Sequence, residues 1–284
     1  AIFLHGPPVL AGFAWLLRKT SKPVAWSSGV LALLTAAVGV DAFYIEPYRL
    51  ELTRVRIESP KLKRPVRIGV LADLQTDHIG EHEERALRML LAEKPDLILL
   101  PGDFVQSSNA RVREDAWLLF QKVGLKAPLG VFAVQGDVDP PGWPDLFRGL
   151  GVHCFERTGA VEVDGLQITG LSYGDGDNPR LAVPAAERFH VAFAHRPDFA
   201  LGDVGADLLI AGHTHGGQVR LPGIGPLVTL SKVPRDWAAG VTALSGGRTL
   251  VVSRGIGMER GHAPRLRFLC RPELVVIDVA PKPR

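Results

Sequence analysis

Two histidines close together follow a short apolar run that has the length and composition of a buried strand. The run covers Asp207 to Ala211, and His213 and His215 come directly after it, between glycines that permit a tight turn. Side chains two residues apart lie on the same side of an extended backbone, so both imidazoles can reach one small volume. Neutral imidazole is a ligand for Zn, Fe, Mn or Ni. An isolated pair of this kind is also found in ordinary loops, so further residues must decide.

Carboxylates follow two other predicted strands. Val66 to Leu71 is an apolar run with Asp73 just beyond it, and Asp96 to Leu100 is a second apolar run followed by Gly102 and Asp103. A helix is predicted between them over Glu81 to Glu93, because leucines recur there at helical spacing. A strand, helix and strand in this order form a parallel crossover. Both carboxylates therefore lie at the carboxyl edge of one sheet, where α/β proteins bind ligands.

The same arrangement recurs further along the chain. A helical pattern over Ala116 to Val123 precedes a third strand, Gly130 to Val134, which is followed by Asp137. Another strand, ending at Ala194, is followed by His195. The sequence thus predicts an α/β fold in which several strands end in residues that can bind a metal.

Two other stretches predict strands without site residues. Partial alternation over Leu50 to Ile57 indicates an edge strand within a polar connector, Glu46 to Pro65. Val161 to Val163 and Leu166 to Thr169 flank an Asp-Gly pair, which is typical of a hairpin with a type I′ turn.

The first 45 residues are strongly apolar and are predicted to form a transmembrane region of one or two helices. Pro23 to Tyr44 is long enough to span a bilayer, with Trp26 and Tyr44 as interfacial anchors, whereas Ile2 to Leu17 is marginal in length. An alternative interpretation takes Arg18 to Ala42 as a signal peptide.

A short basic loop separates the two apolar runs and predicts their orientation. Arg18, Lys19 and Lys22 favour a cytoplasmic loop, which places everything after Tyr44 outside the cytoplasm. We therefore expect a protein of the plasma or inner membrane with an extracytoplasmic domain, although several arginines after the second run favour the opposite orientation.

Length and composition indicate how the chain is divided and which partners are not expected. The chain has 284 residues, of which 46% are hydrophobic and 22% are charged, enough for a folded domain and an appendage. We divide it into a transmembrane region (1–45), a connector (46–65) and a catalytic domain (66–284). The net charge of +3 comes without a basic run interleaved with aromatics, so nucleic-acid binding is not expected. Cys154 and Cys270 are too few for a disulfide framework.

The order of these motifs resembles that of the calcineurin-like metallophosphoesterases, whose motifs are D-x-H, G-D, G-N-H-D/E, H and G-H-x-H. The resemblance extends from Val66 to about Val279. Three stretches resemble the membrane-anchored branch of that family, which has an amino-terminal spanning segment: the extended Gly212-His-Thr-His-Gly-Gly-Gln218, Ser253-Arg-Gly-Ile-Gly and Arg271-Pro-Glu. The matching stretches are Asp73-Leu-Gln75, Gly102-Asp103, Gly136-Asp137-Val138-Asp139, His195 and Gly212-His213-Thr-His215.

The resemblance implies a fold of two packed mixed β-sheets flanked by helices. It also implies two divalent metal ions, for which mixed carboxylate and imidazole ligands favour Mn, Fe or Zn. Carried over by position, the ligands of one ion are Asp73, Gln75 and His215, those of the other are Asp137, His195 and His213, Asp103 bridges them, and Asp139 has a supporting catalytic role.

This chain departs from the family motifs at three positions. Gln75 replaces a histidine, which offers an amide oxygen in place of an imidazole. Asp137 stands where asparagine is usual, which keeps an oxygen ligand and adds a negative charge. Val138 replaces the histidine that protonates the leaving group, a loss that typically costs about 10²- to 10⁴-fold in rate.

Two functions remain open on this sequence. The first is a membrane-anchored dimetal phosphoesterase that hydrolyses a phosphodiester or pyrophosphate bond. Its partners would be the lipid bilayer and a phosphate-containing small molecule or lipid, such as a UDP-diacylglucosamine-like head group of the cell envelope. The alternative is a catalytically impaired, metal-binding scaffold of the same fold, because the retromer subunit with this fold carries a similar Gly-Asp-Phe-Asp motif.

Overall fold

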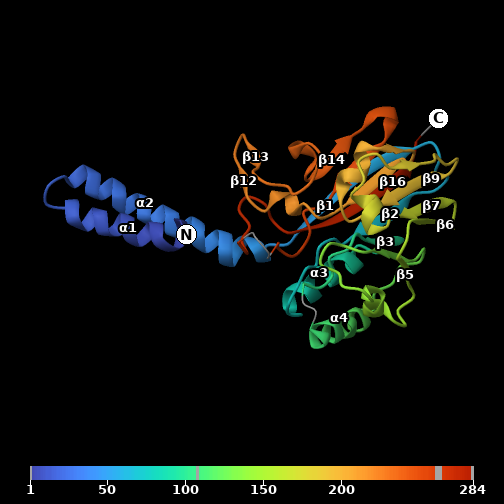
Figure 1. Ribbon diagram of the computed structural model, residues 1–284, viewed down its shortest axis with the longest axis horizontal. Helices are drawn as coiled ribbons and strands as arrows, with labels where there is room; N and C mark the ends of the chain where they lie inside the picture. The colour runs from blue at the N-terminus through green and yellow to red at the C-terminus, as the bar shows by residue number, and fades with distance from the viewer. Residues whose placement is uncertain (1, 107–108, 260–263, 283–284) are drawn as a thin grey trace.

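A pair of helices projects from a body built of two β-sheets (Figure 1). The computed structural model describes residues 2–106, 109–259 and 264–282, so the last two residues of the predicted catalytic domain, and 260–263 within it, lie outside the described part.

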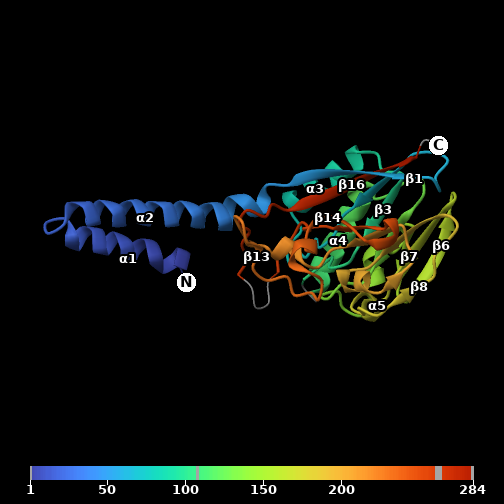
Figure 2. The same cartoon turned by 90° about the horizontal axis from the view of Figure 1, so that it is seen from above.

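The first two helices lie side by side and run in opposite directions (Figure 2). They are α1 (Ile2–Leu17) and α2 (Lys22–Val40), which continues through a π-helical turn (Asp41–Ile45) and a 3-10 turn (Glu46–Tyr48). Gly39 of α2 permits close packing, because an added Cβ atom would lie 3.1 Å from the Cβ atom of Phe3. Among the described residues one helix, Lys22–Tyr48, is long and apolar enough to cross a membrane, and it includes the span expected from the sequence.

The first sheet is mixed and carries the three carboxylate-bearing strands predicted from the sequence. Its strand order is β1 (Glu51–Ser59), β16 (Glu273–Pro281), β2 (Val66–Val70), β3 (Leu97–Leu100), β4 (Val131–Val134) and β5 (Val152–Phe155). Strands β2 to β5 are parallel, β16 is antiparallel to β2, and β1 is parallel to β16. The edge strand expected in the connector is β1, which makes the connector part of this sheet.

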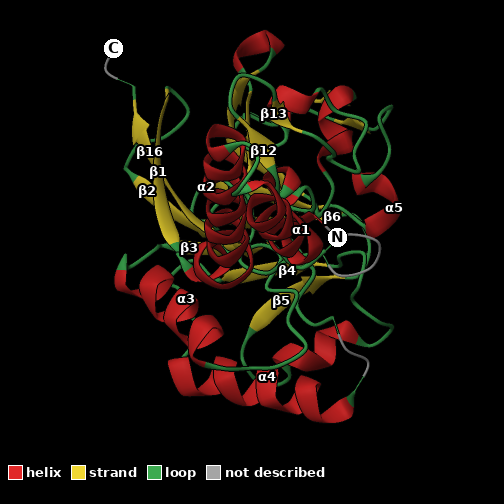
Figure 3. Ribbon diagram, turned by 90° about the vertical axis from the view of Figure 1, so that its left-hand side faces the viewer, coloured by secondary structure: helices red, strands yellow, loops and turns green. Residues whose placement is uncertain are grey.

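Two helices cover the outer face of the first sheet (Figure 3). They are α3 (Glu81–Ala92) and α4 (Ala110–Val123), and both agree with the helices predicted from leucine and alanine spacing. Leu87 of α3 and Phe120 of α4 pack in one core cluster with Ile98 and Leu100, which β3 directs outward.

The second sheet carries the histidine-bearing strands. Its order is β14 (Gly240–Ala243), β15 (Thr249–Val252), β11 (Leu208–Ala211), β9 (Phe189–Phe193), β7 (Leu166–Gly170) and β6 (Gly159–Val163). Strands β7, β9, β11 and β15 are parallel. The predicted hairpin is formed by β6 and β7, and its turn residues Asp164 and Gly165 have φ values of 49° and 80°, as a type I′ turn requires.

Smaller elements lie in the connections between the strands of the two sheets. They are α5 (Tyr173–Gly176), the paired strands β8 (Ala182–Val183) and β10 (Asp203–Val204), the hairpin β12 (Arg220–Leu221) and β13 (Gly225–Pro226), and 3-10 turns at Trp143–Phe147, Pro197–Leu201, His215–Gly217, Arg235–Trp237 and Ser245–Gly247.

The main core lies between the two sheets, and further apolar clusters cover their outer faces. Burial on both faces explains why the predicted strands are continuous apolar runs. Each sheet directs aliphatic and aromatic side chains inward, among them Ile68, Leu99, Phe132, Ile168, Val191 and Ile210. The predicted fold class, two packed mixed sheets flanked by helices, is therefore confirmed.

Two glycines bring the carboxyl ends of β3 and β4 into contact. Gly102 has a φ of +88°, and a Cβ atom there would lie 2.5 Å from the backbone nitrogen of Gly136. A Cβ atom on Gly136 would lie 2.2 Å from the backbone nitrogen of Asp103. Any side chain at either position would force the two loops apart.

We expect Gly136→Ala to destabilise the protein by about 1–3 kcal/mol or more, because the methyl group collides with backbone that cannot move away. The measurement is the thermal unfolding midpoint of the full chain in detergent. Gly174→Ala is the matched control, since no atom lies within 4 Å of a Cβ atom built there. Equal midpoints for the two variants would contradict the close contact.

Candidate metal centre

The residues that follow β2, β3, β4, β9 and β11 meet where the carboxyl ends of the two sheets come together. Five of them have backbone φ values in the positive region, namely 50° at Asp73, 38° at Gln75, 57° at Asp103, 68° at His213 and 47° at His215. Such strained conformations persist only where the surrounding structure enforces them, and they are frequent at functional sites.

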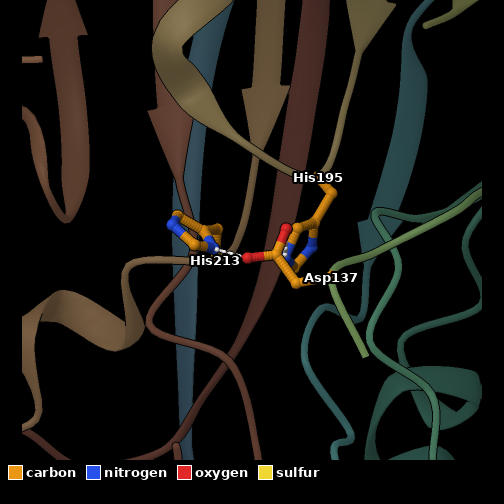
Figure 4. A group of neighbouring side chains, drawn as sticks. All are labelled: Asp137, His195 and His213. Carbon is orange, nitrogen blue, oxygen red and sulfur yellow. Dashed lines mark ion pairs between the residues drawn. The ribbon is translucent and has the colours of Figure 1, made fainter. Parts of the chain in front are cut away.

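One group of potential ligands consists of Asp137, His195 and His213, whose ligand atoms all lie within 4.8 Å of one another. Figure 4 shows the Asp137 carboxylate between the two rings. Its Oδ2 lies 3.2 Å from His213 Nδ1, and its Oδ1 lies 3.6 Å from His195 Nε2.

A second group consists of Asp73, Asp103 and His195, again with all ligand atoms within 4.8 Å. His195 Nε2 lies 3.3 Å from Asp103 Oδ2, and its Nδ1 lies 3.8 Å from Asp73 Oδ1. Because His195 belongs to both groups, the two potential cation positions adjoin each other.

Both imidazoles are oriented as metal-binding histidines usually are. His195 Nδ1 lies 2.8 Å from the carbonyl oxygen of Pro101, and His213 Nε2 lies 2.9 Å from that of Leu230. In each ring the other nitrogen faces the carboxylates. A carbonyl acceptor on one nitrogen fixes the tautomer and leaves the lone pair of the other nitrogen for a cation.

The acidic side chains carry charge that the described residues do not fully neutralise. Asp73 is completely buried, its Oδ2 has no hydrogen-bond partner among the described residues, and burial raises its pKa to about 7 despite the nearby His195. Burial, together with the neighbouring Asp139, raises the pKa of Asp103 well above its usual value. A divalent cation would favour both ionised forms, so the donor set fits such ions.

Gln75 and His215, the other two predicted ligands, are buried beside these groups. The Gln75 backbone N–H donates to the carbonyl of Asp103 over 2.7 Å, and its Nε2 donates to Gln106 over 2.9 Å. Its Oε1 is buried without a hydrogen-bond partner among the described residues, so this amide oxygen is what it offers a cation. His215 belongs to neither group of three, and its carbonyl accepts from the Cys270 thiol over 3.2 Å.

Asp139 holds the loops of the site in place. Its carboxylate accepts hydrogen bonds from the backbone N–H groups of Asp103, Phe104 and Gly136, each over 2.8 Å. The carboxylate therefore binds both loops that carry Asp103 and Asp137.

Arg196 is a site residue that the sequence argument did not identify. Its Nε and Nη2 donate to the two oxygens of Asp137 over 2.9 and 2.6 Å, and its Nη1 lies 3.1 Å from Asp177. Burial alone would raise the pKa of Asp137, but the hydrogen bonds from His213 and Arg196 outweigh it and hold the pKa well below its usual range. The sequence feature that could have identified Arg196 is its position directly after His195, at the end of a strand that was already expected to reach the site.

Comparison with known proteins gives relatives that cover most of the chain. The chain is 28% identical to the uncharacterized metallophosphoesterase YkuE of Bacillus subtilis, and the match covers 87% of this chain and 91% of the relative. It is 29% identical to the phosphodiesterase YaeI of Escherichia coli, over 93% of this chain and 97% of the relative. A transmembrane protein with metallophosphoesterase domain from Danio rerio is 25% identical, over 92% of this chain and 66% of the relative. No protein-family model matches the chain.

We expect His195→Ala to lower the bound divalent metal more than His213→Ala does, because His195 belongs to both groups and His213 to one. The measurement is metal content per chain by elemental analysis of the purified full chain after incubation with Mn. His190→Gln is the control, since His190 is also fully buried but lies 2.8 Å from Thr169 Oγ1, away from the site. An unchanged metal content in His195→Ala would contradict the assignment.

Proposed function

Since the chain is homologous to the metallophosphoesterases over most of its length, we propose that it is a membrane-anchored, metal-dependent hydrolase of phosphodiester or pyrophosphate bonds. The observation that carries the proposal is the pair of adjoining ligand groups that share His195 at the carboxyl ends of the two sheets. A homologue that is named a phosphodiesterase supports the reaction class.

The proposed ligand set follows the family order. Asp103 would be a ligand shared by two divalent ions, for which the mixed carboxylate and imidazole donors favour Mn, Fe or Zn. When bound, two such ions lower the pKa of a water molecule and neutralise charge on a phosphate, so no nucleophilic side chain is required. In the family order Asp73, Gln75 and His215 would hold one ion, and Asp137, His195 and His213 the other. His195 also lies close to Asp73 and Asp103, so its imidazole would support both positions.

Arg196 compensates for the aspartate that this chain has at position 137. Asp137 adds a negative charge where the family has asparagine, and the bidentate pair with Arg196 neutralises that charge. The Arg196 side chain is 23% exposed beside Asp137, so its positive charge can also act on an incoming phosphate.

Val138 restricts the substrates that can be cleaved. Its backbone N–H donates to Asp103 Oδ1 over 2.9 Å and so helps to orient that carboxylate, but its side chain cannot protonate a leaving group. A leaving group that is already a weak base needs no proton in the transition state. Diesters of acidic alcohols and pyrophosphates meet this condition.

The apolar helix extends the proposal to the membrane. Lys22–Tyr48 anchors the chain in the plasma or inner membrane, and a homologue named as a transmembrane protein supports this anchoring. The substrate is a lipid or cell-envelope head group of the UDP-diacylglucosamine type, and the basic loop between α1 and α2 favours a catalytic domain outside the cytoplasm. Nucleic acid is not expected as a partner.

A second function, a metal-binding scaffold without activity, is favoured by one observation. Gln75 and Val138 remove two of the imidazoles that the family motifs contain. Hydrolysis of a bis-aryl phosphate by the full chain with added Mn, measured beside its metal content, separates the two functions. Two bound metals without hydrolysis at any metal concentration would favour the scaffold.

We expect Val138→His to raise the turnover of alkyl phosphate esters by on the order of 10²-fold and to change the turnover of a bis-aryl phosphate little, because only the poor leaving group needs a proton. The measurement is kcat for both substrates at saturating Mn. Equal gains on both substrates would contradict the proposed role of this position.

Gln75→His serves as the contrast to that variant. It replaces an amide oxygen by an imidazole at a proposed ligand position, so it should lower the Mn concentration for half-maximal activity and leave the ratio between the two substrates unchanged.

We expect the carboxyl-terminal domain to lie outside the cytoplasm. A reporter that is active only in the cytoplasm, fused to the carboxyl end of the chain, should therefore be silent, while the same reporter inserted in the loop between α1 and α2 should be active. The reverse pattern would assign the substrate to the inner leaflet.

A further inference from the structure

We propose that the catalytic domain makes a second contact with the bilayer through an apolar surface beside the metal centre. This surface, the hairpin lobe, consists of 219–230 with β12 and β13, together with Leu269. The inference rests on the membrane anchoring proposed above, and it assigns the lobe to the head-group region of the same membrane.

Large apolar side chains are concentrated on the hairpin lobe. The exposed fraction is 62% for Ile224, 61% for Val228, 62% for Leu230, 52% for Leu269 and 43% for Leu227. The other exposed large apolar side chains that the structure describes from residue 49 onward are distributed over separate elements, namely Leu118, Tyr173, Leu201 and Val241. A contiguous exposed apolar patch is typical of an interaction surface, whereas single exposed residues are ordinary.

The hairpin lobe lies next to the end of the membrane helix. The Arg267 N–H donates to the carbonyl of Ala42 over 3.0 Å, so 267–270 packs against the last turns of that helix. The same segment bonds the base of the lobe, because the Arg220 N–H donates to the carbonyl of Phe268 over 2.9 Å. Figures 1 and 2 show β13 at the end of the domain that faces α2. A helix that enters the bilayer therefore brings the lobe to its surface.

Basic residues flank the apolar tip as they do in proteins that bind at the membrane interface. Arg220 and Arg235 line a hollow of about 720 Å³ together with Ile224 and Leu269, and Asp236 lies in the same hollow. Guanidinium groups beside apolar side chains suit the boundary between lipid phosphates and acyl chains. This combination favours a lipid surface as the occupant.

The hairpin lobe ends at the metal centre. The side chain of Leu230 is exposed, while its carbonyl oxygen lies 2.9 Å from Nε2 of His213. Two residues later the Lys232 N–H donates to the Asp198 carboxylate over 2.9 Å, which fixes this end of the lobe beside Arg196. Docking of the lobe would therefore hold the metal centre at the depth of lipid head groups. This position favours a membrane lipid as the substrate, with its phosphodiester or pyrophosphate as the bond that is cleaved.

The test is the membrane depth of single nitroxide labels on the full chain in phosphatidylglycerol-containing nanodiscs. The labels are placed by Ile224→Cys and Val228→Cys in the lobe, by Leu33→Cys in the helix and by Leu118→Cys on α4, all in a Cys154→Ser background. Leu33 and Leu118 are 73% and 48% exposed, so neither substitution disturbs the core. Collision rates with oxygen, which partitions into lipid, and with a water-soluble nickel complex give the depth.

We expect the two lobe labels to lie between the other two, with higher oxygen and lower nickel accessibility than Leu118→Cys, and with a shallower depth than Leu33→Cys. If Leu33→Cys is lipid-exposed but the lobe labels resemble Leu118→Cys, the second contact is wrong and the anchoring stands. If Leu33→Cys itself is exposed to nickel, the proposed anchoring fails. Lobe labels that are shielded from both reagents would overturn the proposal in favour of a protein partner.

Discussion

The metal centre depends on one buried carboxylate that is not itself among the grouped ligands. Asp139 accepts three backbone N–H groups from the loops that follow β3 and β4. Those loops touch only because Gly102 and Gly136 lack side chains. A buried carboxylate needs donors of this kind to offset its loss of hydration. The same bonds hold the backbone at Asp103 and next to Asp137. They therefore help to set the distance between the two ligand groups.

The aspartates of the site, Asp73, Asp103 and Asp137, differ in the positive charge that lies near them. Asp73 and Asp103 are buried with few donors, and burial favours their protonated forms, so a cation is the group that would stabilise both as anions. Asp137 is different, because Arg196 already supplies a positive charge through two hydrogen bonds. An asparagine there would leave Arg196 with Asp177 as its remaining carboxylate partner. The charge of Asp137 is thus balanced within this chain by Arg196.

Most of the fold and much of the site could be predicted from the sequence, because the signal was local. Each strand that bears a site residue is an apolar run followed by glycine or a ligand type, and the parallel crossover then places Asp73 and Asp103 at one edge. The Arg196 pair with Asp137 joins residues 59 positions apart and depends on how the two sheets meet, which no local pattern records. The hydrogen bonds of Asp139 could not be predicted from a local pattern either. The motif suggested a supporting catalytic role, and only the structure identifies the backbone N–H groups that Asp139 binds.

Specific buried contacts join the apolar helix Lys22–Tyr48 to the candidate metal centre. Cys270 donates its backbone N–H to the Glu46 carboxylate at the end of the helix and its thiol to the carbonyl of His215. Next to it the fully buried Arg267 donates to the carbonyls of Gly257 and Cys270, which leaves no freedom for this segment to swing. The strand β1 that follows the helix is paired along its whole length with β16. These contacts join the helix to the domain through buried bonds and a paired strand. Under the proposed anchoring, the direction in which the helix enters the bilayer would therefore also set which face of the candidate metal centre is turned toward the lipid.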